Sequence, residues 1–137
     1  EQEPAAELLP VALKKQVGII VRVAFDEGVL TGKYSADSTF PEGDFRQNYF
    51  AGDRIERAVN RVKKIERDIS DTGLSLPQVA LKFAMSHDAV STVIPGIRNV
   101  QQAEANIAVS DLPELSDDLI HRLHKHHWRR AFWYAGK

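Results

Sequence analysis

Two short runs of β-branched and aliphatic residues constrain the fold of this chain more than any other feature. The first run extends from Val17 to Val23 and the second from Ser91 to Ile94. The first is apolar on both faces, which is typical of a buried strand in a parallel sheet. Segments with helical periodicity precede and separate the two runs, so the order indicates parallel βαβ geometry. Because two parallel strands cannot close a sheet, the pattern predicts a piece of a larger α/β fold.

The helical segments carry recognisable start signals. Ser75, Asn99 and Ser116 each precede an apolar-periodic stretch and suit the N-cap position. Gln102 follows Asn99 by three residues, as the partner in a capping box does. We expect helices over residues 4–16, 53–70, 76–87, Asn99 to about Val109, and 117–127.

The connection between the first strand and the second helix, residues 24–52, is long and contains four of the chain's eight glycines and many aromatic residues. We expect its larger part, residues 31–52, to form a long loop. Loops of this length inside a compact fold are uncommon unless they serve a function. We therefore predict a functional loop between the first strand and the helix over residues 53–70.

Composition limits the classes of protein that fit. The chain has 137 residues, which suits a single segment, 1–137, within one domain, and its last part is a C-terminal helix and tail, 116–137. A net charge of -1 gives no global field for nucleic acid or anionic membrane. The absence of cysteine excludes disulfides and thiolate metal sites, and it suits a cytoplasmic protein. No apolar run approaches the roughly 20 residues that span a bilayer. Since the chain begins with Glu1 and not methionine, we expect a piece of a longer protein.

The strongest local signal is the stretch from Ile94 to Asn106, in which a strand ends, Gly96 follows and a helix begins at once. The first turn of a helix offers free N–H groups and positive dipole charge, which favour phosphate. Arg98 stands at this opening with a guanidinium suited to phosphate oxygens. Gln102 and Asn106 lie one and two turns further along the same face and could meet an adenine edge. The alternative is that Pro-Gly forms a simple turn and Arg98 is a solvated charge.

The second signal is the stretch from Arg22 to Tyr34, which follows the first strand. Ligands of parallel α/β folds gather at the carboxyl ends of the strands. A plain loop with glycine turns is the alternative interpretation of this stretch.

Together these segments resemble the aldo-keto reductase family. The stretch from Arg22 to Tyr34 is similar to the segment after barrel strand seven. The stretch from Ser91 to Asn106, with its G-x-R-x-x-x-Q-x-x-x-N spacing, is similar to strand eight and the cofactor helix. The segment Leu76 to Phe83 is similar to the helix between them. The resemblance implies the C-terminal portion of a (β/α)8 TIM barrel, with about two parallel strands and flanking helices, that binds NADP(H) without a Rossmann fold.

The resemblance also implies a role for individual residues. It assigns Arg98 to the adenosine 2′-phosphate, and it places Gln102 and Asn106 near adenine. The other positions that it assigns to the cofactor are Gly96 and Ile97 beside the phosphate, Val23, Phe25 and Gly28 along the pyrophosphate, and Arg22 on the nicotinamide. The chain departs from the family pattern at Ala24, where proline is frequent, at Ala105, where a glutamate is usual, and at the acidic pair Asp26 and Glu27.

No residue of this chain matches a catalytic position of the family, whose Asp, Tyr, Lys and His come from the first four strands. Tyr34, Tyr49 and Tyr134 do not stand at the matching position. The resemblance therefore implies a cofactor-binding half that reduces small aldehydes or ketones by hydride transfer only when the barrel is complete, with the N-terminal half or another copy as partner. A non-catalytic half-barrel that serves as a binding or scaffold module, and a regulatory subunit with this fold, are the alternatives.

Three further groups of residues favour ordinary structural roles. His121 and His124 share a helix face, but no carboxylate-histidine motif accompanies them, so a solvated helix is favoured over a metal site. The arginines of helix 53–70 alternate with acidic residues, which favours a salt-bridged solvent face over nucleic-acid binding. The aromatic tail from Trp128 to Tyr134 is interpreted, by the resemblance, as packing near the substrate mouth.

Overall fold

The structure is a computed structural model that describes residues 2–129 of the chain. Its elements, in chain order, are α1 (Glu3–Ala6), α2 (Leu8–Lys14), β1 (Ile19–Arg22), the 3-10 helix η1 (Asp26–Thr31), α3 (Arg46–Tyr49), α4 (Arg54–Asp68), α5 (Leu76–Met85), β2 (Val90–Ile94), α6 (Val100–Ala108), the 3-10 helix η2 (Val109–Asp111) and α7 (Asp117–His124).

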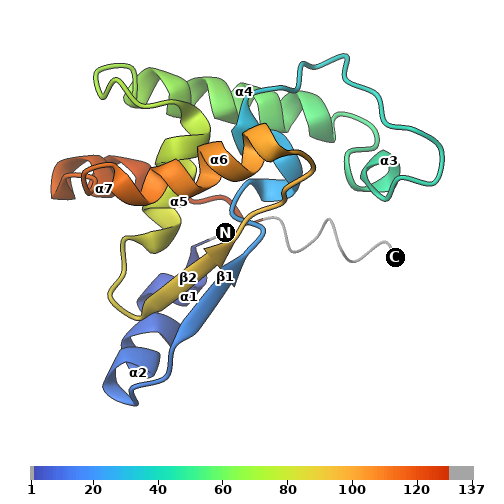
Figure 1. Ribbon diagram of the computed structural model, residues 1–137. Helices are drawn as coiled ribbons and strands as arrows, with labels where there is room; N and C mark the ends of the chain where they lie inside the picture. Colours follow the sequence, from blue (N-terminus) through green and yellow to red (C-terminus); the bar gives the residue numbers. More distant parts are fainter. Residues whose placement is uncertain (1, 130–137) are drawn as a thin grey trace.

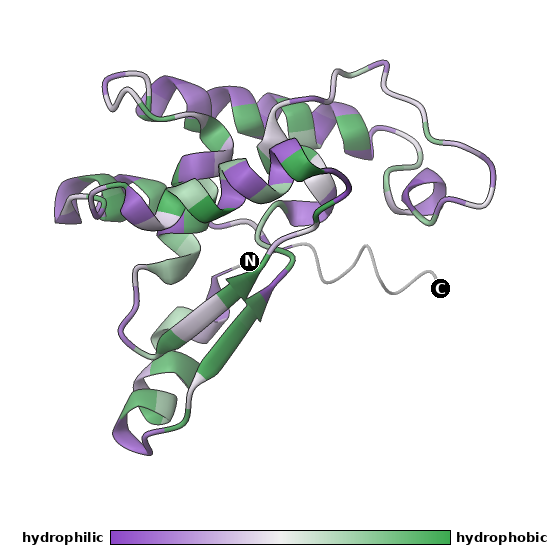
Figure 2. Ribbon diagram, viewed as in Figure 1, coloured by the Kyte–Doolittle hydropathy of each residue, from purple (hydrophilic) through white to green (hydrophobic). Residues whose placement is uncertain are grey.

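The two strands form one parallel sheet, as the sequence predicts. Ile20 pairs with Thr92 and Arg22 with Ile94, so both strands end at the same edge. The chain leaves β1 at that edge, passes through the long connection, α4 and α5, and returns to start β2 (Figure 1). Figure 2 shows both strands as largely hydrophobic. This is the geometry of consecutive strands in a βαβ arrangement.

The buried core lies among the helices and not on the sheet. It joins α4, α5 and α7 to η1 and the aromatic residues at the end of the long connection. Val79 in α5 and Ala58 in α4 are almost fully enclosed. The core side chains are Val29, Tyr49, Phe50, Ile55, Ala58, Val59, Val62, Ile69, Leu76, Val79, Leu115, Leu119 and Leu123.

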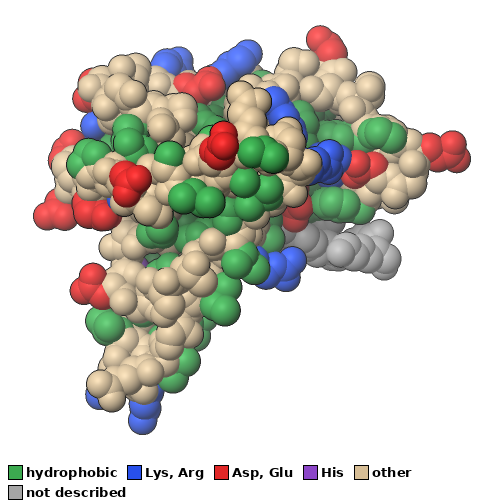
Figure 3. Space-filling model, in the orientation of Figure 1, with side chains coloured by type: hydrophobic (Ala, Val, Ile, Leu, Met, Phe, Trp, Pro, Cys, Tyr) green, Lys and Arg blue, Asp and Glu red, His purple; other side chains and the backbone are tan. Residues whose placement is uncertain are grey.

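The sheet and the first helices, in contrast, expose apolar side chains. Ile20 of β1 is 64% exposed and Ile94 of β2 is 57% exposed, and Val11 of α2 is 57% exposed. Figure 3 shows hydrophobic side chains that reach the surface along the arm built by the strands and α2. Ile19 and Val21 of β1 are half-buried, whereas Ile20 on the other face is exposed, so one face of the strand lacks the layer that a buried strand normally packs against.

The expected helix over residues 4–16 is wrong in one respect: it is two helices that meet at Glu7. Pro10 explains the break. A continuous helix needs an N–H of residue 10 to bind the carbonyl of Ala6, but proline has no N–H and its ring clashes with that carbonyl. The helix therefore restarts at Leu8, where Pro10 lies in the first turn.

The other helices match the sequence patterns to within a few residues. Ser116 accepts a hydrogen bond from the Leu119 N–H, and Gln78 accepts one from the Ser75 N–H, so both expected N-termini are confirmed. The last helix ends at His124 and not at residue 127. Here the chain changes to hydrogen bonds between residues three apart, and His126 and His127 turn toward Asp68 and Glu3. No helix within residues 2–129 is both long and apolar enough to cross a membrane.

Candidate functional site

The parallel register brings the two segments of interest to one edge of the sheet. Because Arg22 pairs with Ile94 at the carboxyl ends of both strands, the chain after β1 and the chain after β2 leave the sheet side by side. The segment after β1 carries Val23, Phe25 and Gly28, and the segment after β2 leads directly into α6. This edge is where parallel α/β folds bind ligands, so we take it as the candidate site.

The start of α6 is fixed by two side chains. The Asn99 side chain accepts a hydrogen bond from the Gln102 N–H at 2.8 Å, as an N-cap does. The Gln102 side chain accepts from the Arg98 N–H, also at 2.8 Å. The capping box expected from the sequence is thus half right, because Gln102 binds the N–H before Asn99 and not that of Asn99. The consequence is that the Arg98 backbone is tied to the first turn of the helix.

The side chains that follow β2 are open to solvent. Ile97 is 53% exposed, and Gly96 and Arg98 are also exposed. Within residues 2–129, no salt bridge or hydrogen bond occupies the Arg98 guanidinium. Asn106, one turn beyond Gln102, is half-buried, and its Nδ2 is a buried donor that has no hydrogen-bond partner in the described part of the chain. A cation and an unpaired amide donor therefore lie along one side of α6.

The segment after β1 has an unusual backbone. Val23, Asp26 and Glu27 have φ angles of 59°, 50° and 55°, and Gly28 has 94°. The left-handed region is uncommon for residues other than glycine and especially unfavourable for β-branched valine. Side chains of this segment vary in accessibility: Arg22 and Val23 are exposed, whereas Phe25 and Gly28 are half-buried. Nothing in the sequence signals the strained φ of Val23.

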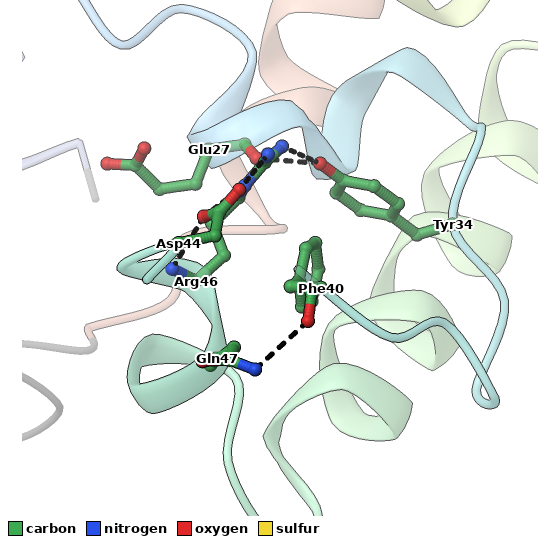
Figure 4. Close-up of polar contacts among 6 residues, drawn as sticks. All are labelled: Glu27, Tyr34, Phe40, Asp44, Arg46 and Gln47. Atoms are coloured by element: carbon green, nitrogen blue, oxygen red, sulfur yellow. Dashed lines mark hydrogen bonds and ion pairs between the residues drawn. The ribbon is translucent and has the colours of Figure 1, made fainter. Parts of the chain in front are cut away.

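The long connection folds back over this segment through a cluster of polar contacts (Figure 4). Arg46 donates from Nε to Asp44 Oδ1 at 2.9 Å and from Nη1 to the Tyr34 hydroxyl at 2.7 Å. The Tyr34 hydroxyl in turn donates to the Glu27 carbonyl oxygen at 3.3 Å. The sequence identified the loop but not this cluster, since an Asp and an Arg two residues apart are a very common pattern. The cluster connects the middle of the loop to the strained backbone after β1.

Charge links the loop to α6 as well. The hydrogen bond from the Arg46 side chain, together with its backbone N–H, lowers the pKa of Asp44 to about 2. The positive charge of Arg98 contributes to the same lowering. The Asp44 carboxylate is 18% exposed and the Arg46 side chain 13% exposed, so this pair is largely enclosed. The loop thus places a carboxylate–guanidinium pair within the electrostatic reach of Arg98.

Neither tyrosine that can be described has the setting of a free proton donor. The Tyr34 hydroxyl is bound to Glu27 and Arg46, and Tyr49 is buried in the core with 6% of its surface exposed. Tyr134 lies outside the described residues, as does most of the aromatic tail.

The histidines at and just after the end of α7 form contacts between elements. His126 lies 2.7 Å from Asp68 at the end of α4, and His124 lies 2.7 Å from Gln2. Within residues 2–129 there is no group of three or more side chains that could hold a metal ion.

The fold defines a class of protein: part of a parallel α/β barrel, in which the strand ends and the following helix form the candidate site. Solved structures share this fold. The glycerol dehydrogenase of Gluconobacter oxydans matches with a TM-score of 0.79 and 23% identity over 92% of this chain. The aldo-keto reductase of Bacillus halodurans, in its holo form, matches with a TM-score of 0.64 and 22% identity over 93% of the chain.

The family model of the Aldo/keto reductase family matches residues 1–127, and the chain therefore belongs to this family. A similar protein is the probable voltage-gated potassium channel subunit beta of Oryza sativa subsp. japonica, 31% identical over 86% of this chain. The aldo-keto reductase yakc of Schizosaccharomyces pombe, whose name carries NADP(+), is 24% identical over 87% of the chain. The resemblance and the fold class expected from the sequence are confirmed.

The chain spans less than two fifths of these relatives. It covers 38% of the rice protein, 35% of yakc and 38% of the glycerol dehydrogenase chain. Residues 2–129 accordingly contain two parallel strands, whereas a complete barrel of this class has eight.

Proposed function

We propose that this chain supplies the NADP(H)-holding part of an oxidoreductase that reduces small aldehydes or ketones. One observation carries the proposal. The parallel register brings the strained segment after β1 and the start of α6, with Arg98 just before it, to the same edge of the sheet. Both segments resemble the stretches of the family that hold the cofactor, and we propose the same role for them here. Membership of the family supports an oxidoreductase, and the name of the yeast relative supports NADP as its cofactor.

The residues after β2 fit the phosphate end of this cofactor. Arg98 presents an exposed guanidinium, and such a group binds phosphate oxygens in pairs. The first amides of α6 have no acceptor inside the helix and favour an anion. No atom lies within 4 Å of the position that a Cβ on Gly96 would take, so a ligand can approach the backbone there. The unpaired Nδ2 of Asn106 offers a donor for an adenine acceptor.

The residues after β1 fit a second, extended part of the cofactor. Val23, Phe25 and Gly28 are proposed to lie along the pyrophosphate, and Arg22 to pack on the nicotinamide. The acidic side chains of this segment are a possible conflict, because a carboxylate repels a pyrophosphate. The Glu27 carbonyl accepts the Tyr34 hydroxyl, and Figure 4 shows the Glu27 carboxylate directed away from the Tyr34 ring.

When bound, NADPH supplies the hydride that, with a proton, converts a carbonyl group into an alcohol. This chain binds and orients the cofactor, and the proton donor for the carbonyl oxygen lies elsewhere in the completed barrel. Tyr34 and Tyr49 are engaged in the loop and the core, as described above. We therefore propose that residues 1–137 alone do not reduce a carbonyl substrate. The partner that they need for the reaction is the N-terminal part of the barrel. A cytoplasmic location stays a prediction.

The test is the cofactor affinity of Arg98→Ala in the full-length gene product. A charged hydrogen bond is worth about 1.5–3 kcal/mol, so NADPH should bind roughly 10- to 150-fold more weakly. NADH, which lacks the 2′-phosphate, should bind with unchanged affinity. Arg67→Ala removes the same charge from the exposed face of α4 and should change neither affinity. Equal losses of NADPH and NADH in Arg98→Ala would contradict the assignment.

A regulatory subunit is the second candidate, and one observation favours it. Two relatives, from rice and from Arabidopsis thaliana, bear the name probable voltage-gated potassium channel subunit beta, at 31% and 28% identity. Turnover separates the two candidates. An oxidoreductase oxidises NADPH when offered an aldehyde series, whereas a regulatory subunit binds NADPH with no more than trace turnover.

A further inference from the structure

The backbone from Val23 to Gly28, which includes the start of η1, is strained where the cofactor is proposed to lie. Three residues other than glycine occupy the left-handed region there, with φ angles of 59° at Val23, 50° at Asp26 and 55° at Glu27. This conformation is unfavourable for each of these residues, and it persists only where the surroundings enforce it. The question is which side chains enforce this conformation.

Tyr34 contacts the strained backbone directly. Its hydroxyl donates to the Glu27 carbonyl oxygen at 3.3 Å. Its ring covers Gly28 so closely that a Cβ on Gly28 would lie 2.8 Å from the hydroxyl oxygen and 3.3 Å from Cε2. Thr31 supports the same turn, since its hydroxyl donates to the Gly28 carbonyl at 2.6 Å. Tyr34 therefore holds both the peptide group and the close packing of this turn.

Tyr34 is itself held by the middle of the loop. Arg46 donates to the Tyr34 hydroxyl at 2.7 Å, which leaves that hydroxyl free to use its own proton toward Glu27. Asp44 fixes Arg46 through Nε and the backbone N–H, each at 2.9 Å, and through Nη2. The guanidinium also lies 5.0 Å from the centroid of the Phe40 ring, and that ring meets the Tyr34 ring edge-on at 5.3 Å. We call these four residues, Tyr34, Phe40, Asp44 and Arg46, the Tyr34 network.

We infer that Tyr34 is a positioning residue, which presents the backbone of residues 26–28 to the pyrophosphate of a dinucleotide. Its own side chain does not contact that ligand. Arg46 and Asp44 set the orientation of the Tyr34 side chain. The inference rests on the proposed function. It adds a residue that the family pattern does not assign, and it gives the long loop a defined task. It also accounts for the positive φ angles at Glu27 and Gly28, which the Tyr34 side chain contacts directly.

The test compares two probes in the full-length protein. NADPH reaches both halves of the site, whereas 2′-AMP carries the adenosine and its 2′-phosphate but no pyrophosphate. Tyr34→Phe keeps the ring and removes the hydroxyl, so NADPH should bind about 3- to 10-fold more weakly while the affinity for 2′-AMP stays unchanged. Without any ligand, the amides of Gly28 and Leu30, which donate to the Phe25 carbonyl, should exchange their hydrogens faster. Ser35→Ala, which removes an exposed hydroxyl of the same loop, should change none of these quantities.

A second variant guards against simple misfolding. Arg46→Lys keeps the charge but cannot reach Asp44 and the Tyr34 hydroxyl together. It should weaken NADPH to the same degree as Tyr34→Phe, and the double variant should be no weaker than the single ones, because both remove one connected unit. Unchanged NADPH affinity in Tyr34→Phe, or an equal loss of NADPH and 2′-AMP, would overturn the inference. If the unmodified protein binds neither probe, the proposed function fails first and the inference with it.

Discussion

Substitution of Gly28 by alanine separates backbone strain from packing at the candidate site. Gly28 has a φ angle of +94°, and a Cβ added there would meet the Tyr34 hydroxyl oxygen at 2.8 Å and its ring at 3.3 Å. Gly43 in the same loop offers a matched control. Its φ angle is +79°, but an added Cβ would have no atom within 4 Å. Gly28→Ala and Gly43→Ala thus share the conformational penalty, and only Gly28→Ala adds a clash.

The expected magnitudes follow from these contacts. Alanine in the left-handed region costs about 1–2 kcal/mol, and the lower entropy of the unfolded chain returns roughly 0.4–1 kcal/mol. Gly43→Ala should therefore reduce the free energy of unfolding by about 1 kcal/mol. At Gly28 the contact of 2.8 Å lies well below van der Waals distance, so overpacking adds about 1–3 kcal/mol. Gly28→Ala should accordingly cost about 2–4 kcal/mol.

Urea unfolding of the full-length protein, followed by circular dichroism, measures both values. Tyr34→Phe in the Gly28→Ala background should restore part of the loss, because the nearest contact then becomes the ring at 3.3 Å. NADPH affinity should fall in Gly28→Ala and stay unchanged in Gly43→Ala. Equal destabilisation by the two glycine variants would refute the reasoning, since it would mean that Tyr34 does not lie against this turn.

Three further outcomes are expected. Hydrogen exchange across residues 34–52 should slow when NADPH binds, and unchanged protection would count against a loop that closes on the cofactor. The isolated chain 1–137 should self-associate in sedimentation, because apolar side chains such as Ile20, 64% exposed, lie open on the sheet. It should also show no carbonyl reduction, because the proton donor lies elsewhere in the barrel. A monomer that unfolds cooperatively would contradict the first expectation. Arg46 lowers the pKa of Asp44 from 3.8 to about 2 in the folded chain, so the ionised carboxylate stabilises the fold. The free energy of unfolding should therefore decline as the pH falls from about 4 toward 2 and Asp44 becomes protonated. Asp44→Asn should show a smaller decline over the same interval.

The sequence predicts the regular elements well because their signals are local. The alternation of strand and helix, the caps at Ser75, Asn99 and Ser116, and the buried face of α4 all follow from spacing along the chain, and the structure has each of them. Residues 4–16 are the exception: their periodicity predicts one helix, whereas Pro10 divides the segment into α1 and α2. The candidate site could be placed at one edge of the sheet for a related reason, since parallel strands necessarily end together.

The Tyr34 network could not be found in the same way, because it depends on contacts that no spacing encodes. Asp44 and Arg46 follow Tyr34 by ten and twelve residues in an irregular loop, and their contact with Tyr34 depends on how that loop folds back. Lys82 is a similar case: it lies on the apolar side of α5, buried at 2% exposure, and is neutralised by Glu114 from the segment before α7. Such pairs stabilise a buried charge only when both partners are brought together by the completed fold. The family pattern names the residues that contact the cofactor directly, whereas the loop that holds them in position differs from the regular elements in having no periodic signal. We therefore expect the residues that tune the proposed cofactor site to lie in the loop, and variants in the loop to be the most informative about cofactor affinity.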